Sequence, residues 1–420
     1  MSKSLHVYLN RKRAGLLIQN EHGLLEFEYS PDYLEYPKAI PLSNSLPLRP
    51  EIFSARECRG FFSGILPEEI NRELVAKNLG ISAGNDFSML KEIGGECAGA
   101  ISFLSEEQEA RPMEDLYRNL SESELATILK QLPHRPLLAG EESIRLSLAG
   151  AQSKLVVRVE GEKIAVPLND SPSTHILKPD STSFDGLVFN EAFCMKLADQ
   201  CGLPTAKVEI RNAENAPYLL IERYDRMKFT GMQASTHGHF NDRLHQEDFC
   251  QALGILSKQK YEKEGGPSLK ACFELVTKRS HIPILDRQRL LDAVIFNFLI
   301  GNNDAHGKNF SFTYHHNGEI VITRFAPLYD LICTAYYPAL DKNMAMKLGS
   351  KSLLAGIKPE HFEEFASEAS LSKSLVKKRV RELALKIQAT IPKVHIDNHI
   401  SKEVGIWIND HCTKVLALNW

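Results

Sequence analysis

The sequence has few of the features that mark a secreted, membrane-spanning or disulfide-rich protein. Its 420 residues contain no stretch near the roughly 20 apolar residues of a membrane span, and the N-terminus lacks an apolar signal core. The eight cysteines are scattered, with neither a C-x-x-C pair nor metal-ligand spacing. We therefore expect a cytoplasmic protein whose thiols are reduced and lie in its core.

Excess positive charge is also absent. Lysine and arginine number 50 against 53 acidic residues, which gives a formal net charge of −3. The chain as a whole therefore has no electrostatic attraction to nucleic acid, and any DNA contact would need a local patch or a partner. The basic run Lys377–Arg381 is more typical of a solvated helix face.

Glycine-rich phosphate-binding motifs are missing as well, since the chain has neither a G-x-G-x-x-G nor a Walker A sequence. The nearest signal is Ser147–Lys154, where Gly150 and small neighbours form a turn between two β-like segments. Small residues let backbone N–H groups approach phosphate oxygens, and Lys154 could add charge. A plain β-hairpin with glycine at its turn explains the same residues equally well.

Residues 1–105 read as a separate α+β unit. Three short β-type segments predict a small antiparallel sheet, and a helical stretch and one more strand complete the unit. A charged segment interrupted by proline, residues 106–113, then suits a linker. The predicted strands are Leu5–Leu9, Ala14–Ile18, Leu24–Tyr29 and Ala98–Leu104, and the helical stretch is Arg56–Leu79.

Residues 106–226 favour a five-stranded β layer with one helix between its third and fourth strands. A capping box at Ser121 opens an earlier helix. Lys178 lies at the end of a strand. It is either a solvated edge residue or the lysine that binds the nucleotide phosphates in a kinase. Glu191, early in the helix Val188–Cys201, is either its ion-pair partner or an acid favoured by the helix dipole. The strand Pro217–Arg226 is apolar at its centre, as expected of a buried hinge strand.

Residues 227–420 read as mainly helical. The polar stretch Met227–Arg243 is interpreted as a mobile β-ribbon or a disordered insertion, and a helical pattern begins at Gln246. Further helices are predicted over Ser268–Lys278, Asp286–Ile300, Glu360–Ala369, Ser372–Thr390 and Ile400–Leu416. These segments complete a helical region after the β layer.

The helix Asp286–Ile300 leads into a polar loop in which Asp304 and Asn309 are five residues apart. A kinase catalytic loop has this spacing: its Asp accepts the substrate hydroxyl proton and its Asn holds Mg²⁺. Taken alone, the loop is more simply a turn rich in Asn, Asp and Gly. Asp330, however, follows a hairpin predicted at Asn317-Gly318, where a kinase carries its second Mg²⁺ carboxylate. The order of these signals favours phosphoryl transfer.

This combination resembles the HipA family of bacterial toxin kinases over nearly the whole chain. In the N-terminal unit the matching residues are Leu42–Pro47, Gly64–Pro67 and Leu90–Ala100. In the remainder they are Ser147–Lys154, His175–Lys178, Asn190-Glu191, Leu219–Arg226, Arg243–Asp248, Asn303–Phe310 and Ala326–Asp330. The resemblance implies a two-lobed protein-kinase-like α+β fold preceded by a small N-terminal subdomain. The division would be 1–105 for that subdomain, 106–226 for the small lobe and 227–420 for the helical large lobe.

The family's chemistry implies a Ser/Thr kinase that uses ATP and Mg²⁺. By motif position, Asp304 would be the catalytic base and Asn309 and Asp330 would hold Mg²⁺. His306 would orient the loop or the phosphoryl group, or would serve only as a structural hydrogen-bonding residue. The nucleotide would be bound by the backbone of residues 148–152 and by named side chains. These cofactor-binding residues are Leu148, Ala149, Gly150, Ala151, Gln152, Lys154, Lys178, Glu222 and Lys308, with Asn309 and Asp330.

Control and partners are implied by the same resemblance. Ser147 matches the family's autophosphorylated position, although a serine also suits a tight turn. The expected partner is a HipB-like helix-turn-helix antitoxin, with operator DNA reached only through it. Glutamyl-tRNA synthetase is the leading candidate substrate. Ser153 departs from the acidic residue frequent in the family's hairpin, which leaves substrate choice open. Two alternatives remain, namely a small-molecule phosphotransferase and an inactive kinase acting as a co-repressor with its antitoxin.

Overall fold

A computed structural model describes residues 2–109, 115–227, 243–318, 320–418 and 420. The polar stretch Met227–Arg243 lies almost entirely outside these ranges, so its interpretation stays a prediction. The chain divides into two compact units, each built from several segments. Unit 1 comprises residues 1–179, 211–258 and 313–322, and unit 2 comprises residues 180–210, 259–312 and 323–420.

Unit 1 begins with the predicted small antiparallel sheet. Its strands are β1 (Lys3–Leu9), β2 (Lys12–Gln19), β3 (Leu25–Tyr29) and β4 (Ile101–Leu104), in the order β3-β2-β1-β4. The chain also forms α1 (Pro31–Leu34), α2 (Ala55–Gly64), α3 (Glu69–Leu79), α4 (Asp86–Ile93) and α5 (Glu106–Glu109). Alternate side chains of β3 are buried, and Phe27 packs against Phe53 and Phe62 between sheet and helix. This packing explains the strand alternation seen in the sequence.

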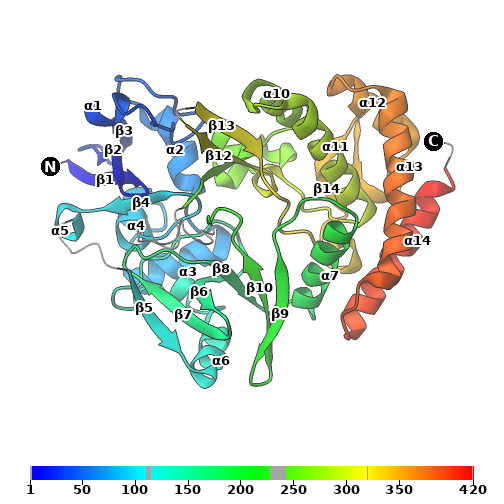
Figure 1. Ribbon diagram of the computed structural model, residues 1–420, viewed down its shortest axis with the longest axis horizontal. Coiled ribbons are helices and arrows are strands. Elements are labelled where there is room, and N and C mark those ends of the chain that lie inside the picture. Colours follow the sequence, from blue (N-terminus) through cyan, green and yellow to red (C-terminus); the bar gives the residue numbers. More distant parts are fainter. Residues whose placement is uncertain (1, 110–114, 228–242, 319, 419) are drawn as a thin grey trace. The chain divides into compact units, whose positions relative to one another are not determined.

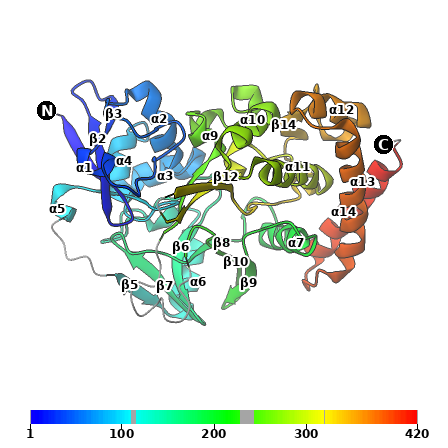
Figure 2. The same cartoon turned by 45° about the horizontal axis from the view of Figure 1, so that its top comes forward.

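A larger sheet in unit 1 has six strands in the order β5-β7-β6-β8-β10-β9. The strands are β5 (Leu116–Leu120), β6 (Leu155–Glu160), β7 (Lys163–Leu168), β8 (His175–Pro179), β9 (Val208–Ala213) and β10 (Ala216–Glu222). Helix α6 (Glu122–Gln131) lies against strands of this sheet (Figure 2). Its Leu125, Ile128 and Leu129 share one buried cluster with side chains of the sheet, and the predicted capping box is present at Ser121. The five predicted strands are confirmed, and β5 is an edge strand that the sequence pattern did not predict.

Two local predictions in unit 1 are wrong. The β-like segment expected before the turn at Gly150, residues 144–149, forms no strand. The backbone of this region makes isolated bridges, Leu146 to Glu96 and Gly150 to Pro67, instead of a hairpin ladder. The helix expected from Gln246 is instead the strand β11 (His245–Asp248) followed by the four-residue α9 (Phe249–Ala252). In both places tertiary hydrogen bonds and burial override the local pattern.

The hairpin predicted around Asn317-Gly318 is present as β12 (Ser311–Asn317) and β13 (Ile320–Phe325). It forms a three-stranded sheet in the order β11-β12-β13. Gly318 has φ +66°, the left-handed conformation that a tight hairpin turn requires. The hairpin therefore connects the polar loop that precedes it to the segment carrying Asp330.

Unit 2 is mainly helical. Its helices are α7 (Leu187–Gln200), α10 (Leu269–Arg279), α11 (Pro283–Leu299), α12 (Pro359–Glu368), α13 (Lys373–Thr390) and α14 (His399–Leu416). Figure 1 shows α13 and α14 side by side. Phe298 of α11 packs edge-on against Phe362 of α12 and His411 of α14. A short hairpin, β14 (Asn343–Leu348) and β15 (Lys351–Leu353), completes the unit.

All eight cysteines are buried and none forms a disulfide, as their scattered spacing led us to expect. Burial raises the pKa of Cys58, Cys97 and Cys272 to about 12, so these thiols stay protonated. Among the described residues, no helix is both long and apolar enough to cross a membrane.

Candidate active site

The polar loop of unit 2 is fixed at its start by the end of α11. Gly301 has φ +71°, and a Cβ there would lie 2.4 Å from the Trp407 ring, so only glycine fits. The Asn302 side-chain amide donates to Asn297 Oδ1 over 2.8 Å. The backbone N–H of Asn303 donates to Thr334 Oγ1 over 2.7 Å. The loop therefore leaves the helix in one defined direction.

Asp304 and Asn309 take different positions within this loop. Asp304 is exposed, whereas Asn309 is buried at the end of a single 3₁₀ turn, Gly307–Asn309. Asn309 Oδ1 accepts a hydrogen bond from the His306 backbone N–H over 3.0 Å, and Nδ2 donates to Asp330 Oδ2 over 3.0 Å. The turn thus holds one carboxylate open to solvent and brings the asparagine to the second carboxylate.

Asp330 is held by the segment that follows β13. The Tyr329 hydroxyl donates a hydrogen bond to the Lys308 carbonyl over 2.7 Å, and Ser311 Oγ lies 2.6 Å from the same hydroxyl. Asp330 itself has φ +58°, a left-handed conformation that aspartate and asparagine tolerate better than most residues. The structure therefore brings Asn309 and Asp330 together, although they are separated by the hairpin in sequence.

The chemistry of these side chains fits Mg²⁺. An amide and a carboxylate supply oxygen ligands, and Mg²⁺ in phosphoryl-transfer sites is held by one or two carboxylates together with substrate phosphates. Among the residues described, no three His, Cys, Asp or Glu side chains cluster as a self-sufficient metal site. The pair Asn309 and Asp330 would therefore need phosphate and water oxygens to complete the coordination of the ion.

One contact in this loop could not be expected from the sequence. The Tyr261 hydroxyl donates to Asp304 Oδ1 over 2.8 Å, and its ring lies edge-on to the His306 ring at 5.4 Å. Tyr261 precedes Asp304 by 43 positions and has no motif that marks it. Only the folded chain brings it to Asp304.

Unit 1 carries the segment predicted to bind phosphate. Ser147 is fully buried: its N–H donates to the Glu96 carbonyl over 2.9 Å and its hydroxyl to the Ile65 carbonyl over 3.0 Å. Asn71 Nδ2 donates to the Ala151 carbonyl over 2.6 Å. The segment from Ser147 to Ala151 is therefore held by the N-terminal part of the chain.

Gly150 is required at the turn of this segment. Its φ is +109°, and a Cβ would lie 2.7 Å from Lys154 Nζ. Lys154 Nζ in turn donates to the Ala149 carbonyl over 3.1 Å. The contact between Lys154 and Ala149 thus closes a loop that contains Gly150. A larger side chain at position 150 would displace the Lys154 side chain and break this contact.

Lys178 and Glu222 lie on neighbouring strands of the six-stranded sheet. Lys178 pairs with Leu219 in the β8–β10 ladder, and Glu222 pairs with His175. Lys178 is buried, which is unusual for a lysine and consistent with a functional position. The predicted ion pair between Lys178 and Glu191 would join residues of the two units, and it stays a prediction.

A buried charge cluster in unit 1 also has no counterpart among the sequence predictions. Glu96 lies 3.0 Å from Arg223 and 2.5 Å from both Arg226 and Arg243. Burial alone would raise the pKa of Glu96, but the three guanidinium groups outweigh it and lower the pKa to about 2. Because the Glu96 carbonyl accepts from Ser147, this cluster also supports the predicted autophosphorylation segment.

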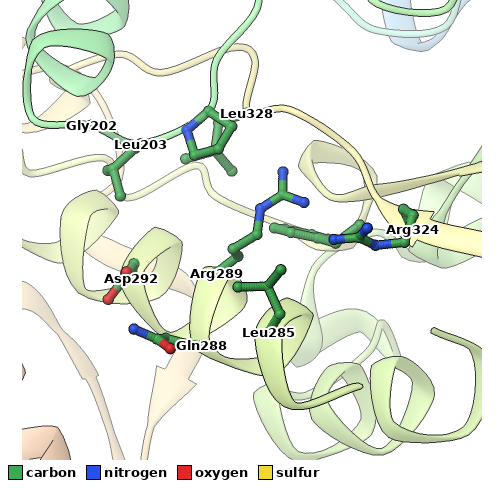
Figure 3. Close-up of a pocket in the computed structure, with 10 residues that line it drawn as sticks. Gly202, Leu203, Leu285, Gln288, Arg289, Asp292, Arg324 and Leu328 are labelled. Carbon is green, nitrogen blue, oxygen red and sulfur yellow. The ribbon is translucent and has the colours of Figure 1, made fainter. Parts of the chain in front are cut away.

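A separate cavity of about 450 Å³ lies in unit 2 (Figure 3). Figure 3 shows Arg289 extending between Leu285 and Leu328. Its charged groups already have protein partners: Arg289 and Arg324 both contact Asp286, and Asp292 contacts Arg379. None of the predicted site residues lines it. The lining residues are Gly202, Leu203, Pro204, Leu285, Gln288, Arg289, Asp292, Arg324, Phe325 and Leu328.

Comparison with known proteins gives relatives that cover most of this chain. A protein of Sinorhizobium fredii named as a kinase, Y4mE, is 46% identical over 90% of this chain and 89% of its own length. The serine/threonine-protein kinase toxin HipA of Shewanella oneidensis is 29% identical over 87% of this chain and 83% of its own. The solved complex of Shewanella oneidensis HipA with HipB and operator DNA is similar in structure. It has a TM-score of 0.85 and 26% identity, and it covers 99% of this chain and 98% of that one.

Two family models match the sequence. The HipA N-terminal domain matches residues 5–104, and the HipA-like C-terminal domain matches residues 146–391. With the structural similarity, these matches establish the α+β, kinase-like fold. The chain belongs to the HipA family.

Proposed function

We propose that this protein is a toxin kinase that transfers phosphate from ATP to serine or threonine residues of a protein, with Mg²⁺. The observation that carries the proposal is the 3.0 Å hydrogen bond between Asn309 and Asp330, in a loop that also carries the exposed side chain of Asp304. The relatives named as kinases support the same reaction class.

Each residue has a distinct role in the proposed reaction. Asp304 would accept the hydrogen bond of the substrate hydroxyl and orient it for attack. Asn309 and Asp330 would hold Mg²⁺, which offsets negative charge on the phosphates. The buried Lys178 would contact the phosphates, and the backbone of residues 148–152 would cover them, with Lys154 nearby. Glu222, at the end of β10, would meet the adenine.

His306 and Lys308 would act mainly by shaping the loop. The His306 backbone N–H fixes the Asn309 amide, and the Lys308 carbonyl accepts from Tyr329. Both side chains are buried. We also propose that one of these side chains contacts the transferred phosphoryl group. Such a contact would stabilise negative charge on that group and lower the barrier to phosphoryl transfer.

We further propose that Ser147 is autophosphorylated and that this switches the kinase off. The fully buried hydroxyl, bonded to the Ile65 carbonyl, leaves no room for a group of roughly −1.5 to −2 charges. Phosphorylation would require residues 147–151 to leave this position, and the phosphate would prevent their return. The phosphate-binding backbone would then be lost.

The test of Ser147 is mass spectrometry after incubation with ATP. Wild type should carry a phosphate that Ser147→Ala lacks, and Ser147→Ala should remain active and toxic. Equal phosphorylation of the two proteins would contradict the switch.

The proposed partners follow the solved relative, which is a complex of HipA with HipB and operator DNA. A HipB-like antitoxin would bind this chain and supply the DNA contact that a net charge of −3 does not favour. The proposed substrate is glutamyl-tRNA synthetase, whose phosphorylation would stop translation and cause growth arrest or persistence.

Phosphoproteomics of cells expressing wild type or Asp304→Gln tests this function and its substrate together. The proposal predicts one or few proteins phosphorylated only with wild type, glutamyl-tRNA synthetase first among them. Growth arrest by both proteins alike, without a differing phosphosite, would favour an inactive co-repressor. A separate assay offers radiolabelled ATP to lysate proteins and to small alcohols. Transfer of the label to the alcohols and not to the proteins would indicate a small-molecule phosphotransferase.

A further inference from the structure

Tyr261 makes a contact with Asp304 that neither the loop motif nor the family comparison assigns. Its hydroxyl donates to Asp304 Oδ1 over 2.8 Å, and both residues belong to unit 2. We propose that Tyr261 is a positioning residue that holds the Asp304 carboxylate in the orientation needed to receive the substrate hydroxyl. This inference rests on the proposed kinase function and extends it to a residue outside the catalytic loop.

The position of Tyr261 is well supported by its own segment. The Tyr261 carbonyl accepts hydrogen bonds from the Glu264 and Gly266 N–H groups, each over 2.9 Å. The adjacent Glu262 carboxylate accepts from the Lys347 N–H of β14 over 2.7 Å. Lys263 bonds to Asp341 over 3.1 Å. Because the segment around Tyr261 is held in this way, its hydroxyl can fix the rotamer of the exposed Asp304 side chain at little further entropic cost.

The ring of Tyr261 has a second contact in the same loop. It lies edge-on to His306 at 5.4 Å, with an interplanar angle of 77°. Lys260 and Lys263 also lie over the ring, 5.4 Å and 5.8 Å from its centroid. The aromatic ring thus contacts the loop independently of the hydroxyl. Removing only the hydroxyl therefore separates orientation of Asp304 from packing of the loop.

The hydrogen bond has a chemical consequence in addition to orientation. A donor to a carboxylate favours its ionised form, which is the form that accepts the substrate proton. The Tyr261 hydroxyl donates to Oδ1 of this carboxylate. Loss of the tyrosine hydroxyl should therefore lower turnover and also make the carboxylate easier to protonate.

The experiment compares Tyr261→Phe with wild type by steady-state phosphorylation of a protein substrate between about pH 5.5 and 8.5. We expect kcat to fall about tenfold, the loss of one hydrogen bond to a charged group. The KM for ATP should stay the same. The acid limb of the kcat–pH profile should move to higher pH, a change that a merely structural role would not produce. Tyr261→Ala should lose more activity, because the ring contact with His306 is lost as well.

Two further variants make the outcome decisive. Tyr336→Phe is the matched control, because it removes a tyrosine hydroxyl that donates to Glu403 elsewhere in unit 2. It should match wild type. The other variant, Asp304→Asn, should be inactive with or without the Tyr261 hydroxyl, so the activity that Tyr261→Phe keeps must still depend on Asp304.

The outcomes separate this inference from the proposed function. If wild type transfers phosphate but Tyr261→Phe keeps its kcat and pH profile, the positioning role is wrong and the kinase function stands. If wild type with ATP and Mg²⁺ phosphorylates nothing, the proposed function fails and the positioning role fails with it.

Discussion

Asp330 combines a functional charge with a backbone conformation that few residues adopt readily. Its φ of +58° favours Asn or Asp, and its carboxylate accepts from Asn309. We predict that Asp330→Asn keeps the fold, because asparagine tolerates this conformation and the same hydrogen bond. Phosphoryl transfer should fall about a hundredfold or more, since a charged Mg²⁺ ligand is lost. The measurements are Tm and kcat at saturating Mg²⁺.

Asp330→Ala is the comparison for that variant. It should be as inactive as Asp330→Asn but less stable by about 1 kcal/mol, because alanine pays the full cost of the left-handed conformation. An Asp330→Asn protein with near wild-type activity would contradict the role of Asp330 as a metal ligand.

At the residue scale, the sequence predicted the groups that lie within one motif. We expected Asn309 and Asp330 to lie together from the loop spacing of Asp304 and Asn309 and from the hairpin that precedes Asp330. The structure places these two side chains in contact. Tyr261 and Glu96 could not be predicted in this way. Each reaches its partner through tertiary packing across many residues, and neither belongs to a local pattern with a known spacing.

The loop at Gly150 is the element on which we expect nucleotide binding to depend most. We predict that Gly150→Ala raises the KM for ATP several-fold, because a Cβ 2.7 Å from Lys154 Nζ would displace the lysine and strain a backbone at φ +109°. Stability should fall by about 1 kcal/mol from the backbone strain. Steady-state kinetics and thermal unfolding measure both effects.

Gly161→Ala is the matched control for this element. Gly161 lies at the turn between β6 and β7 with φ +61°, and a Cβ there meets nothing within 4 Å. It should lose a similar amount of stability and leave the KM for ATP unchanged. An equal change in KM for both variants would mean that the Gly150 effect is only a loss of stability.

At the element scale, long periodic segments were predictable and short ones were not. Apolar residues at helical spacing predicted the long helices α7, α10, α11, α13 and α14. A helix of several turns buries one face, and this leaves a clear periodic pattern in the sequence. The predictions for residues 144–149 and for β11 were wrong. In the first, backbone hydrogen bonds go to Glu96 and Pro67 rather than to a neighbouring strand. In the second, Asp248 caps α9 and ends the strand within four residues.

The stability of the whole molecule should depend on pH through Glu247. Burial raises its pKa to about 7, although Ser43 and Tyr314 donate hydrogen bonds to the carboxylate. Between pH 4.5 and 7 the folded chain then holds a proton that the unfolded chain has lost. The contribution of Glu247 to the free energy of unfolding therefore falls as pH rises through this range, by up to about 3 kcal/mol. His245 and His411 act in the opposite direction, because burial lowers the pKa of each to about 4 and the unfolded chain then binds protons that the folded chain excludes.

Glu96 acts in the opposite direction and at lower pH. Its lowered pKa stabilises the fold above about pH 4.5, and that contribution is lost only as pH falls toward 2. Between about pH 5 and 8 it is constant, so Glu247 alone of the two changes stability there.

Denaturant unfolding at about pH 5.5 and pH 8 measures the Glu247 effect. The quantity to compare is the stability of wild type minus that of Glu247→Gln, because His245 and His411 contribute equally to both proteins. This difference should fall by about 2 kcal/mol from the lower to the higher pH, since glutamine does not ionise. Glu274→Gln, at an exposed position of α10, is the control and should behave as wild type. An equal change with pH in wild type and in Glu247→Gln would mean that Glu247 is already ionised in the folded chain.

At the scale of the whole molecule, the order of the signals was more informative than any one of them. A phosphate segment, a strand lysine, a hinge strand and a catalytic loop occur along the chain in the order that a HipA-type kinase requires. The family models and the structural match confirm the family that this order indicated. The motifs themselves do not indicate the substrate, because it depends on surfaces that recognise a partner and not on the core or the loop. Glutamyl-tRNA synthetase is therefore proposed only from the resemblance to the family.

The most direct test of the central claim is transfer of labelled phosphate from ATP to protein by purified wild type and Asp304→Asn, with Mg²⁺ and with a chelator. We predict labelling only by wild type and only with Mg²⁺, while both proteins unfold at the same temperature. Equal labelling by Asp304→Asn, or labelling by wild type that persists in the chelator, would contradict a Mg²⁺-dependent phosphoryl-transfer site built on Asp304, Asn309 and Asp330.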